Sequence, residues 1–306
     1  MAKRILDCTA SDFARMTKEE LLFAIGASEG RTLACETIGT VTPLLGDVTN
    51  GELAVALGAD ILLLNLFDVD CPQIQGLPPV EPMGVIREVK RLTGRPVGIN
   101  LEPVEVGAGE VDSLWAMTKG RMATLENAQR AADMGVDFIL LTGNPGTGVT
   151  NRAITDTLEL FRTHLGDRLI LAAGKMHASG VPGEGGERIV TQGEVEAFAQ
   201  AGADVILLPA PGTVPGITTP FVQGLVEKAH SLGKLAMTAI GTSQEGADVD
   251  TVRRIALECK MTGADIHHLG DSGYTGIAAP ENITAYSVAI RGLRHTYRRM
   301  GMSLGR

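Results

Sequence analysis

The chain has 306 residues, of which 44% are apolar and 21% charged, a mixture typical of a folded globular protein and unlike that of a disordered one. Its 27 basic and 36 acidic residues give a net charge of −9, which disfavours nucleic acid as a partner because phosphate backbones repel a negative surface. The strongest apolar run, residues 61–67, is too short to span a membrane, so we expect no membrane partner. Four scattered cysteines, with no Cys-x-x-Cys pair and no signal-peptide pattern, favour a cytoplasmic protein with reduced thiols.

The predicted elements begin with one helix and continue as a repeat. The helix runs from Thr17 to Ile25, and Thr17 and Glu20 form a capping-box pattern. After residue 30, apolar runs of two kinds alternate strictly: one begins with Gly and a charged residue, the other with Gly-(Ala/Val)-Asp. In chain order these runs cover residues 30–36, 58–65, 94–100, 135–142, 166–174, 202–209, 233–241 and 263–270. Each run is apolar nearly throughout, which is typical of a strand buried on both faces.

Helical patterns lie between the runs, with apolar residues at three- and four-residue spacing. One helix begins at a second capping box, Thr49-x-x-Glu52, and another at a third, Thr191-x-x-Glu194. Glycine follows the helices just before the next strand, as expected for a C-terminal cap. The remaining helices are predicted over residues 82–92, 124–134, 150–165, 219–232, 250–262 and 281–298.

Eight strands that alternate with eight helices predict a (β/α)8 barrel. We expect a single domain, with an N-terminal helical cap over residues 1–30, the barrel over 31–298 and a tail over 299–306. The alternative is an open, doubly wound sheet, but no Gly-x-Gly-x-x-Gly follows the first strand. The N-terminal helix is expected to plug the N-terminal mouth of the barrel.

Polar residues stand at the carboxyl ends of nearly all the predicted strands, where the active site of such a barrel lies. Packing alone would favour apolar or small residues at these positions, and burying so many polar groups without partners is costly. A polar ligand or a metal therefore explains them better, and we expect an enzyme. The residues are Glu36, Asn65, Asp68, Asp70, Asn100, Glu102, Thr142, Asn144, Lys175, His177, Thr242, Ser243, His267, His268 and Asp271.

Glu36 is the first candidate for a general base, and Glu102 is the second. Glu36 ends an otherwise apolar strand, and burial would raise its pKa toward neutrality, where a base works best. The alternative for Glu36 is an internal salt bridge to Lys175 or Arg31.

Lys175 ends the fifth predicted strand, and His177 follows two residues later as a further catalytic candidate. The lysine can form a Schiff base, hold a carboxylate or phosphate as a charged group, or lie solvated at the rim. The glycine-rich residues 178–188 are predicted to form a mobile lid.

Two loops are predicted to cradle an anion, because backbone N–H groups of glycine-rich turns approach phosphate closely. A further glycine-rich turn, residues 143–150, could hold an anionic or hydroxylated substrate. For all three segments the alternative is a plain tight turn without a ligand. Asn65, Asn100 and Asn144 are further candidates for substrate binding. The cradle residues are Gly241, Thr242 and Ser243 after strand seven, and Gly270, Ser272 and Gly273 after strand eight.

A metal site is predicted at Asp68 and Asp70, with Glu36 and Glu102 on the same arc of the mouth. The sequence identifies no definite cofactor, but oxygen ligands of this kind suit Mg²⁺ or Mn²⁺. Of His267 and His268, at most one faces the barrel interior, because adjacent strand residues point to opposite faces.

A homo-oligomer is one expectation for such a barrel. Four arginines near the C-terminus are interpreted as a solvated helix face in preference to an interface. They are Arg291, Arg294, Arg298 and Arg299.

From Arg31 to Arg298 the chain resembles the phosphate-binding (β/α)8 barrels, the superfamily of ribulose-phosphate-binding enzymes, tryptophan synthase alpha subunits and phosphosugar aldolases. The resemblance rests on the loops Gly241-Thr242-Ser243 and Gly270-Asp271-Ser272-Gly273. A weaker resemblance, carried by Asp68-Val69-Asp70 and Gly174-Lys175-Met176-His177, is to the phosphoenolpyruvate mutase and isocitrate lyase group, which holds Mg²⁺.

These patterns predict an enzyme that acts on a small anionic metabolite, phosphorylated or carboxylated and derived from a sugar. The expected reaction is that of an aldolase or lyase, or of an isomerase or epimerase, through an enolate formed by Glu36 or Glu102 with Lys175 or a metal. One alternative is a metal-assisted hydrolase that uses the carboxylates and His177, or a Mg-dependent lyase like the mutases. The other is a sugar-phosphate-binding protein without catalysis.

Overall fold

The computed structural model describes residues 3–104, 117–143, 148–178, 181, 183 and 185–306 of the chain. In these residues eight parallel strands form a closed barrel, in which each strand pairs with the next in sequence and the eighth pairs with the first. The predicted (β/α)8 barrel is confirmed, and every predicted run overlaps one of the strands, although β1 and β3 extend one or two residues beyond theirs. The strands are β1 (Thr32–Ile38), β2 (Ile61–Asn65), β3 (Val97–Leu101), β4 (Phe138–Leu141), β5 (Ile170–Gly174), β6 (Val205–Pro209), β7 (Leu235–Ile240) and β8 (Ile266–Leu269).

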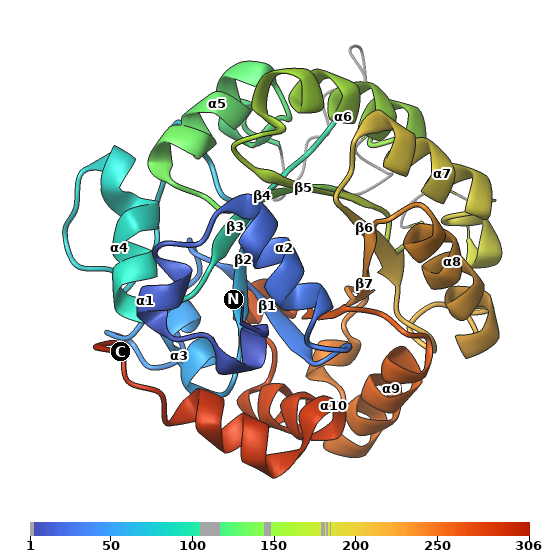
Figure 1. Cartoon of the computed structure of the whole chain (residues 1–306). Helices are drawn as coiled ribbons and strands as arrows, with labels where there is room; N and C mark the ends of the chain where they lie inside the picture. The colour runs from blue at the N-terminus through green and yellow to red at the C-terminus, as the bar shows by residue number, and fades with distance from the viewer. Residues whose placement is uncertain (1–2, 105–116, 144–147, 179–180, 182, 184) are drawn as a thin grey trace.

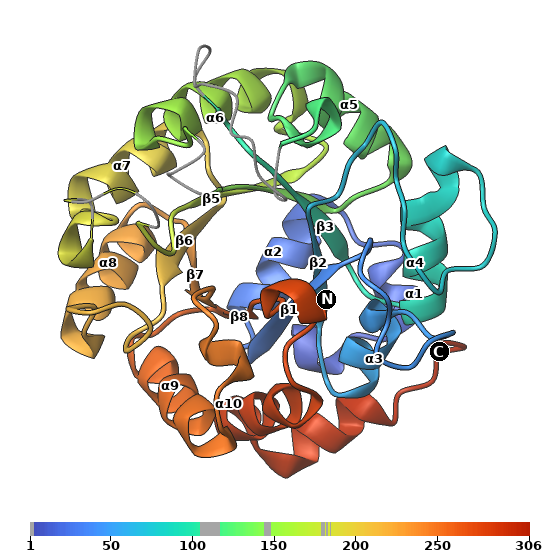
Figure 2. The same cartoon turned by 180° about the vertical axis from the view of Figure 1, so that it is seen from behind.

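Helices surround the barrel as an outer ring (Figures 1 and 2). All three predicted capping boxes are present, at Thr17, Thr49 and Thr191. No helix in the described part of the chain is both long and apolar enough to cross a membrane. The helices are α1 (Ala10–Phe13), α2 (Lys18–Gly26), α3 (Asn50–Ala56), α4 (Val85–Thr93), α5 (Leu125–Met134), α6 (Asn151–Leu165), α7 (Gln192–Ala201), α8 (Thr219–Ser231), α9 (Val249–Met261) and α10 (Pro280–Met300). Three 3-10 turns used below are η3 (Lys119–Arg121), η6 (Gln244–Gly246) and η7 (Gly273–Thr275).

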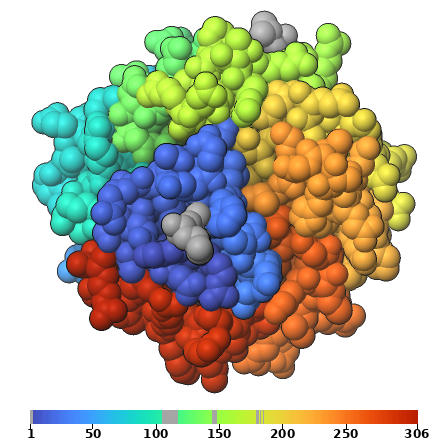
Figure 3. Space-filling view, in the orientation of Figure 1, coloured from blue at the N-terminus to red at the C-terminus, as the bar shows by residue number. Residues whose placement is uncertain are grey.

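Helix α2 lies across the N-terminal mouth of the barrel (Figure 1), and the N-terminal segment covers the centre of this face in Figure 3. Leu21 and Ile25 of α2 belong to the same buried apolar cluster as the inward-facing strand residues such as Leu63. Lys18 anchors the helix, because its ammonium group lies 2.7 Å from the carboxylate of Asp204. With one mouth closed by apolar packing, the opposite mouth is left for polar chemistry.

Four strands are preceded by Gly-(Ala/Val)-Asp, and the four aspartates anchor the barrel in the same way. Its carboxylate accepts a hydrogen bond of 2.8–2.9 Å from a backbone N–H near the start of the preceding strand. Each carboxylate also pairs with a cationic or imidazole side chain on the helix that precedes the two strands in the ring. The sets are Asp60 with Leu33 and Arg291, Asp137 with Val97 and Lys90, Asp204 with Leu171 and Arg162, and Asp265 with Ala236 and His230. The repeat seen in the sequence is thus a repeat of anchoring contacts at the N-terminal ends of the strands.

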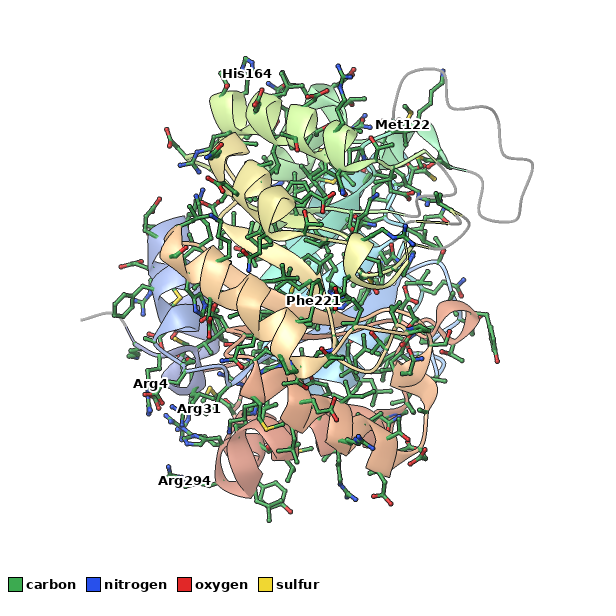
Figure 4. The ribbon with its side chains drawn as sticks, turned by 90° about the vertical axis from the view of Figure 1, so that its right-hand side faces the viewer. Arg4, Arg31, Met122, His164, Phe221 and Arg294 are labelled. Atoms are coloured by element: carbon green, nitrogen blue, oxygen red, sulfur yellow. The ribbon has the colours of Figure 1, made fainter. Side chains whose placement is uncertain are left out.

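The interpretation of the C-terminal arginines as one solvated face is wrong for two of them. Arg291 and Arg299 are buried and both pair with Asp60, because 230 residues of chain bring α10 back against the start of β2. Arg298 is exposed and pairs with Asp7. Arg294 is exposed as predicted and points away from the barrel (Figure 4). Helical periodicity placed the four residues near one another but did not separate the inner pair from the outer pair.

Candidate active site

Inward-facing polar side chains gather at the carboxyl ends of the strands, on the face seen in Figure 2. Because strand residues alternate between the two faces, Glu36 faces inward two residues after Ala34, which belongs to the interior apolar cluster. In the same way, His268 of β8 faces inward two residues after Ile266. The buried polar residues of this region are Glu36, Asn100, Glu102, Thr142, Lys175, Glu245, His268 and Asp271, with half-buried Asn65 beside them.

Glu36 is a buried carboxyl group surrounded by other acids. Burial raises its pKa well above the ordinary value of 4.5, and the charges of Asp271 and Glu245 raise it further. A hydrogen bond from the backbone of Asp271 acts in the opposite direction. Arg31, one of the two predicted partners of Glu36, pairs with Glu29 instead. The basic side chain beside Glu36 is that of His268, whose Nε2 lies 3.7 Å from the carboxyl group. Glu36 therefore has an environment that favours the protonated form of its carboxyl group.

The two adjacent histidines point to opposite sides of β8, as predicted. His267 packs under α10, where its Nδ1 lies 3.2 Å from the hydroxyl of Tyr286 and its Nε2 lies 2.9 Å from the carbonyl of Gly30. His268 faces the barrel interior, and burial lowers its pKa to about 4. Neither ring nitrogen of His268 has a hydrogen-bond partner among the described residues. The inner histidine is thus neutral and has an unused hydrogen-bonding capacity.

A chain of side-chain hydrogen bonds connects β3, β2 and the loop after β8. The amide of Asn100 donates to Asn65 Oδ1 at 3.3 Å, and the amide of Asn65 donates to the carboxylate of Asp271 at 2.8 Å. Asn100 Oδ1 has no partner in the described part of the structure, although it is buried. The structure therefore brings together Asn65 and Asn100, two of the predicted candidates for substrate binding. The Oδ1 atom of Asn100 is available as a hydrogen-bond acceptor.

Glu102 is held by Arg121 of η3 in a buried ion pair. Arg121 was not predicted as a site residue, because no short-range spacing in the sequence connects it with a residue nineteen positions earlier, just after β3. Gly143 lies against the pair, since a Cβ there would be 3.3 Å from Glu102 Cγ. An engaged carboxylate is less suited than Glu36 to take a proton from a substrate.

Lys175 is buried directly after β5, with 3% of its surface exposed. Burial lowers the pKa of His177, and the charge of Lys175 lowers it further, so the two predicted catalytic candidates lie close together. The loop between them packs against the end of β7, because a Cβ at Gly241 would be 1.9 Å from Met176 Sδ. Packing therefore accounts for the glycine at this position of the predicted cradle.

The loops after β7 and β8 adopt tight conformations whose N–H groups bind carboxylates of the chain itself. Ser243, Ser272 and Gly273 all have positive φ angles. The N–H of Ser272 donates to Glu245 at 3.1 Å, and the N–H of Gly273 donates to Asp271 at 2.8 Å. Glu245 was not foreseen, because nothing in a loop sequence indicates that its acid turns inward. These two N–H groups are thus already engaged, which places acidic groups on the β7–β8 side of the mouth.

The remaining members of the predicted cradle lie in the same two loops. The hydroxyl of Thr242 donates to the carbonyl of Thr213 at 3.0 Å. Gly270 fits closely against the carbonyl of Ile240, 2.6 Å from where a Cβ would lie. The hydroxyl of Ser272 is buried and lacks a partner among the described residues.

Asp68 and Asp70, the predicted metal ligands, lie in the loop after β2. Asp68 accepts hydrogen bonds from the N–H groups of Asp70 and Cys71 at 2.8 and 3.1 Å. Asp70 pairs with Arg130 at 2.7 Å, and both of these side chains are about half exposed. Among the described residues, no group of three or more His, Cys, Asp or Glu side chains could hold a metal ion. The two carboxylates are therefore occupied by the loop and by a surface ion pair.

Two predicted features involve residues that the structure does not describe. Asn144 and residues 145–147 of the glycine-rich turn lie outside the described residues. The predicted lid, residues 178–188, includes 179–180, 182 and 184, which also lie outside them.

The chain is similar to known proteins, three of which are the following. A putative N-acetylmannosamine-6-phosphate 2-epimerase of Haemophilus influenzae is 36% identical over 91 residues, which are 29% of this chain, and the match spans about a third of that relative (33%). The structure of an archaeal fructose 1,6-bisphosphate aldolase matches with a TM-score of 0.55 and 14% identity, over 89% of this chain and 98% of that one. A thiamine phosphate pyrophosphorylase from Pyrococcus furiosus has a TM-score of 0.49 and 14% identity, over 86% of this chain and 96% of that one.

The likeness to the aldolase confirms the predicted resemblance to the phosphate-binding barrels at the level of the fold. The weaker likeness to the mutase and lyase group stays a prediction. Residues 6–306 match a family as a whole, and the chain belongs to that family, which is described as a domain of unknown function (DUF7916).

Proposed function

We propose that the protein is an isomerase or epimerase of a small phosphorylated or carboxylated, sugar-derived metabolite, in which Glu36 transfers a proton at the carbon beside a carbonyl group. The observation that carries the proposal is the buried Glu36 carboxyl, with its raised pKa, at the mouth of the barrel. A group that both takes and returns a proton works best when its pKa is near the operating pH.

Glu36 is the better base of the two predicted glutamates. Glu102 is engaged by Arg121 in a buried ion pair, which would have to be broken before the carboxylate could take a proton from a substrate. Glu36 instead lies beside Asp271 and Glu245, whose charges make its own ionised form unfavourable and hence strongly basic.

The charge distribution of the mouth gives an anionic substrate one favoured orientation. Acidic residues lie on the side of β1, β7 and β8, whereas Lys175 and Arg121 follow β5 and β3. The carbonyl oxygen, which gains negative charge in the enolate, would therefore point toward Lys175, which is opposite Glu36 because β1 and β5 are four strands apart in a closed ring of eight. The reacting carbon would then face Glu36.

The proposed reaction needs only these groups. Glu36 in its carboxylate form removes the proton beside the carbonyl, and the electron pair of the C–H bond moves onto the carbonyl oxygen. Lys175 stabilises the negative oxygen of the enolate by hydrogen bonding. In isomerisation, Glu36 returns the proton to the neighbouring carbon. In epimerisation, the Lys175 ammonium group on the other face protonates the same carbon, and Glu36 and Lys175 then recover their starting protonation states by proton exchange with water.

The sequence relative supports this class of reaction. A 2-epimerase changes the configuration of carbon 2, which in an open-chain aldose is the carbon beside the carbonyl. Lys175 favours one alternative, an aldolase that forms a Schiff base, because burial of a lysine at a strand end is a known way to activate its amine.

Exchange with deuterated water tests the proposal, because an enolate picks up deuterium from the solvent. N-acetylmannosamine 6-phosphate, fructose 1,6-bisphosphate and pyruvate would be incubated with the enzyme in D₂O and measured by mass spectrometry. We expect incorporation of one deuterium into one of them, and a loss of about 10²–10⁴-fold in Glu36→Gln. Glu81→Gln is the matched control, because Glu81 is exposed and caps no helix with its side chain. Equal exchange rates in the Glu36→Gln variant and the wild type would remove Glu36 from the mechanism.

A further inference from the structure

His268 is a buried histidine whose hydrogen-bonding groups are not used. Its side chain has no exposed surface, and neither ring nitrogen has a partner among the described residues. A buried polar group without a hydrogen bond is destabilising, because it has lost its hydrogen bonds to water and gained none in the protein. An apolar side chain would fill the same interior position without this destabilisation, so packing alone does not explain why a histidine is found there.

His267 shows how the same fold treats a histidine with a structural role. It is equally buried, one residue earlier on β8, and both of its ring nitrogens have partners, in Tyr286 and Gly30. The contrast between neighbours on one strand indicates that the unused nitrogens of His268 belong to the site that it faces.

We propose that His268 is the positioning residue of Glu36, with its Nε2 accepting a direct hydrogen bond from the carboxyl proton of Glu36. The role of this bond in catalysis rests on the function proposed above, but the bond itself does not. The two atoms lie 3.7 Å apart, and an approach of about 1 Å by side-chain rotation brings them to hydrogen-bonding distance. The proton stays on Glu36, the lone pair of Nε2 accepts it, and the ring hydrogen of the neutral histidine must then be on Nδ1.

The surroundings favour a neutral acceptor for this proton. Asp271 and Glu245 are the other titratable groups that act on Glu36, and both are acids. Burial also raises the pKa of Asp271 and of Glu245, so this corner of the mouth resists gaining negative charge. A neutral imidazole fixes the orientation of the Glu36 carboxyl and holds its proton without adding another charge.

The interior on the other side of His268 is apolar. A cavity of about 30 Å³ there is lined by His268 together with apolar residues of the strands and of α2, among them Leu21 and Ile25. An enclosed water molecule needs two or more polar partners, and this lining does not supply them. The hydrogen bond of the ring is therefore expected on the side of Glu36.

The position of the ring hydrogen tests the bond without any substrate. Nitrogen-15 NMR of the histidine-labelled full chain at neutral pH reports which nitrogen carries it. We expect the Nδ1–H form for His268 in the wild type and in Glu36→Gln, whose amide can also donate to Nε2, and a change to Nε2–H in Glu36→Leu. His267 is the internal reference, with Nε2–H in all three proteins because it donates to the carbonyl of Gly30. An Nε2–H form of His268 in the wild type, or the same spectrum in Glu36→Leu, would overturn the proposal.

A second measurement tests whether the bond serves the reaction. In the deuterium assay with N-acetylmannosamine 6-phosphate, His268→Leu should lower kcat about tenfold or more with little change in KM, and His268→Gln should recover part of the loss. An unchanged kcat in His268→Leu would overturn the positioning role. If the NMR result is as expected but the wild type exchanges none of the three compounds, the proposed function fails and the bond stands. If exchange occurs and His268 carries Nε2–H, the function stands and the bond fails.

Discussion

Arg291 of α10 lies 2.5 Å from the carboxylate of Asp60 at the start of β2, across 231 positions of sequence. Both side chains are fully buried, and Arg299 pairs with the second oxygen of the same carboxylate at 2.7 Å. The backbone N–H of Leu33 donates to Asp60 as well. One carboxylate therefore fastens the last helix of the chain to its first two strands.

Asp60→Asn should destabilise the protein strongly. The variant keeps the shape of the side chain but leaves two buried guanidinium groups without a counter-charge, which costs about 3–5 kcal/mol in the free energy of unfolding. Urea denaturation followed by circular dichroism measures this. Asp7→Asn is the control, because Asp7 pairs with the exposed Arg4 and Arg298 and its loss should cost below about 1 kcal/mol. Equal effects of the two variants would show that the buried network does not hold α10 in place.

Gly174→Ala should damage both stability and the site. Gly174 ends β5 with a φ of +155°, and a Cβ there would lie 2.1 Å from the carbonyl oxygen of Leu207. Because that oxygen belongs to the backbone of β6, the strands must separate, at a cost of about 1–3 kcal/mol, and Lys175 moves with them. Urea denaturation and the deuterium assay measure the two effects. The control, Gly193→Ala in α7, meets its nearest atom at 3.8 Å and should be neutral or stabilising by up to about 1 kcal/mol.

Glu36→Gln should stabilise the protein increasingly as the pH rises. The pKa of Glu36 is raised in the folded state, so the contribution of this group to stability is fully present below the unfolded value of 4.5 and is gone once the pH has passed the folded pKa. Glutamine does not titrate, so the advantage of the variant should grow by about 1.4 kcal/mol per pH unit between the two pKa values. Urea denaturation of both proteins from pH 4 to pH 9 measures the difference. A difference that does not change with pH would mean that the folded protein does not raise this pKa.

Lys175 should act as a hydrogen-bonding group and form no covalent bond. Incubation with fructose 1,6-bisphosphate and borohydride should leave the mass of the protein unchanged, because only an imine would be reduced to a stable adduct. Lys175→Arg should keep measurable deuterium exchange, whereas Lys175→Met should lose at least about tenfold more. An adduct at Lys175 in the mass spectrum would assign the protein to the aldolases that work through a Schiff base.

The fold was predictable because its signals are local and repeated. A glycine followed by an apolar run indicates each strand, and capping boxes at Thr17, Thr49 and Thr191 indicate the starts of three helices. Once eight such strands alternate with helices, the barrel follows, and with it the end at which polar groups meet. The inward position of one of the two histidines was predictable from strand alternation, although not which one.

The details of the site depend on contacts between distant loops, which periodicity does not encode. Arg121 reaches Glu102 from a loop segment, and Glu245 turns inward from η6 to bind the backbone of Ser272. The same limit explains why the burial of Arg291 and Arg299 was not predicted. A helical pattern does not reveal that both side chains pair with Asp60, which is more than 200 residues earlier in the sequence. The roles of Glu36, Lys175 and the other predicted site residues stay predictions for the experiments above.

The four aspartates that lie just before β2, β4, β6 and β8 divide the barrel into four quarters with the same anchoring contact. Each quarter consists of two strands and contains both ends of its own carboxylate-to-backbone contact, as Asp137 and Val97 do in the second. An engineer who wished to exchange or duplicate part of this barrel would therefore place the junctions between β2 and β3, β4 and β5, or β6 and β7. A junction placed inside a quarter would separate an aspartate from the strand it secures.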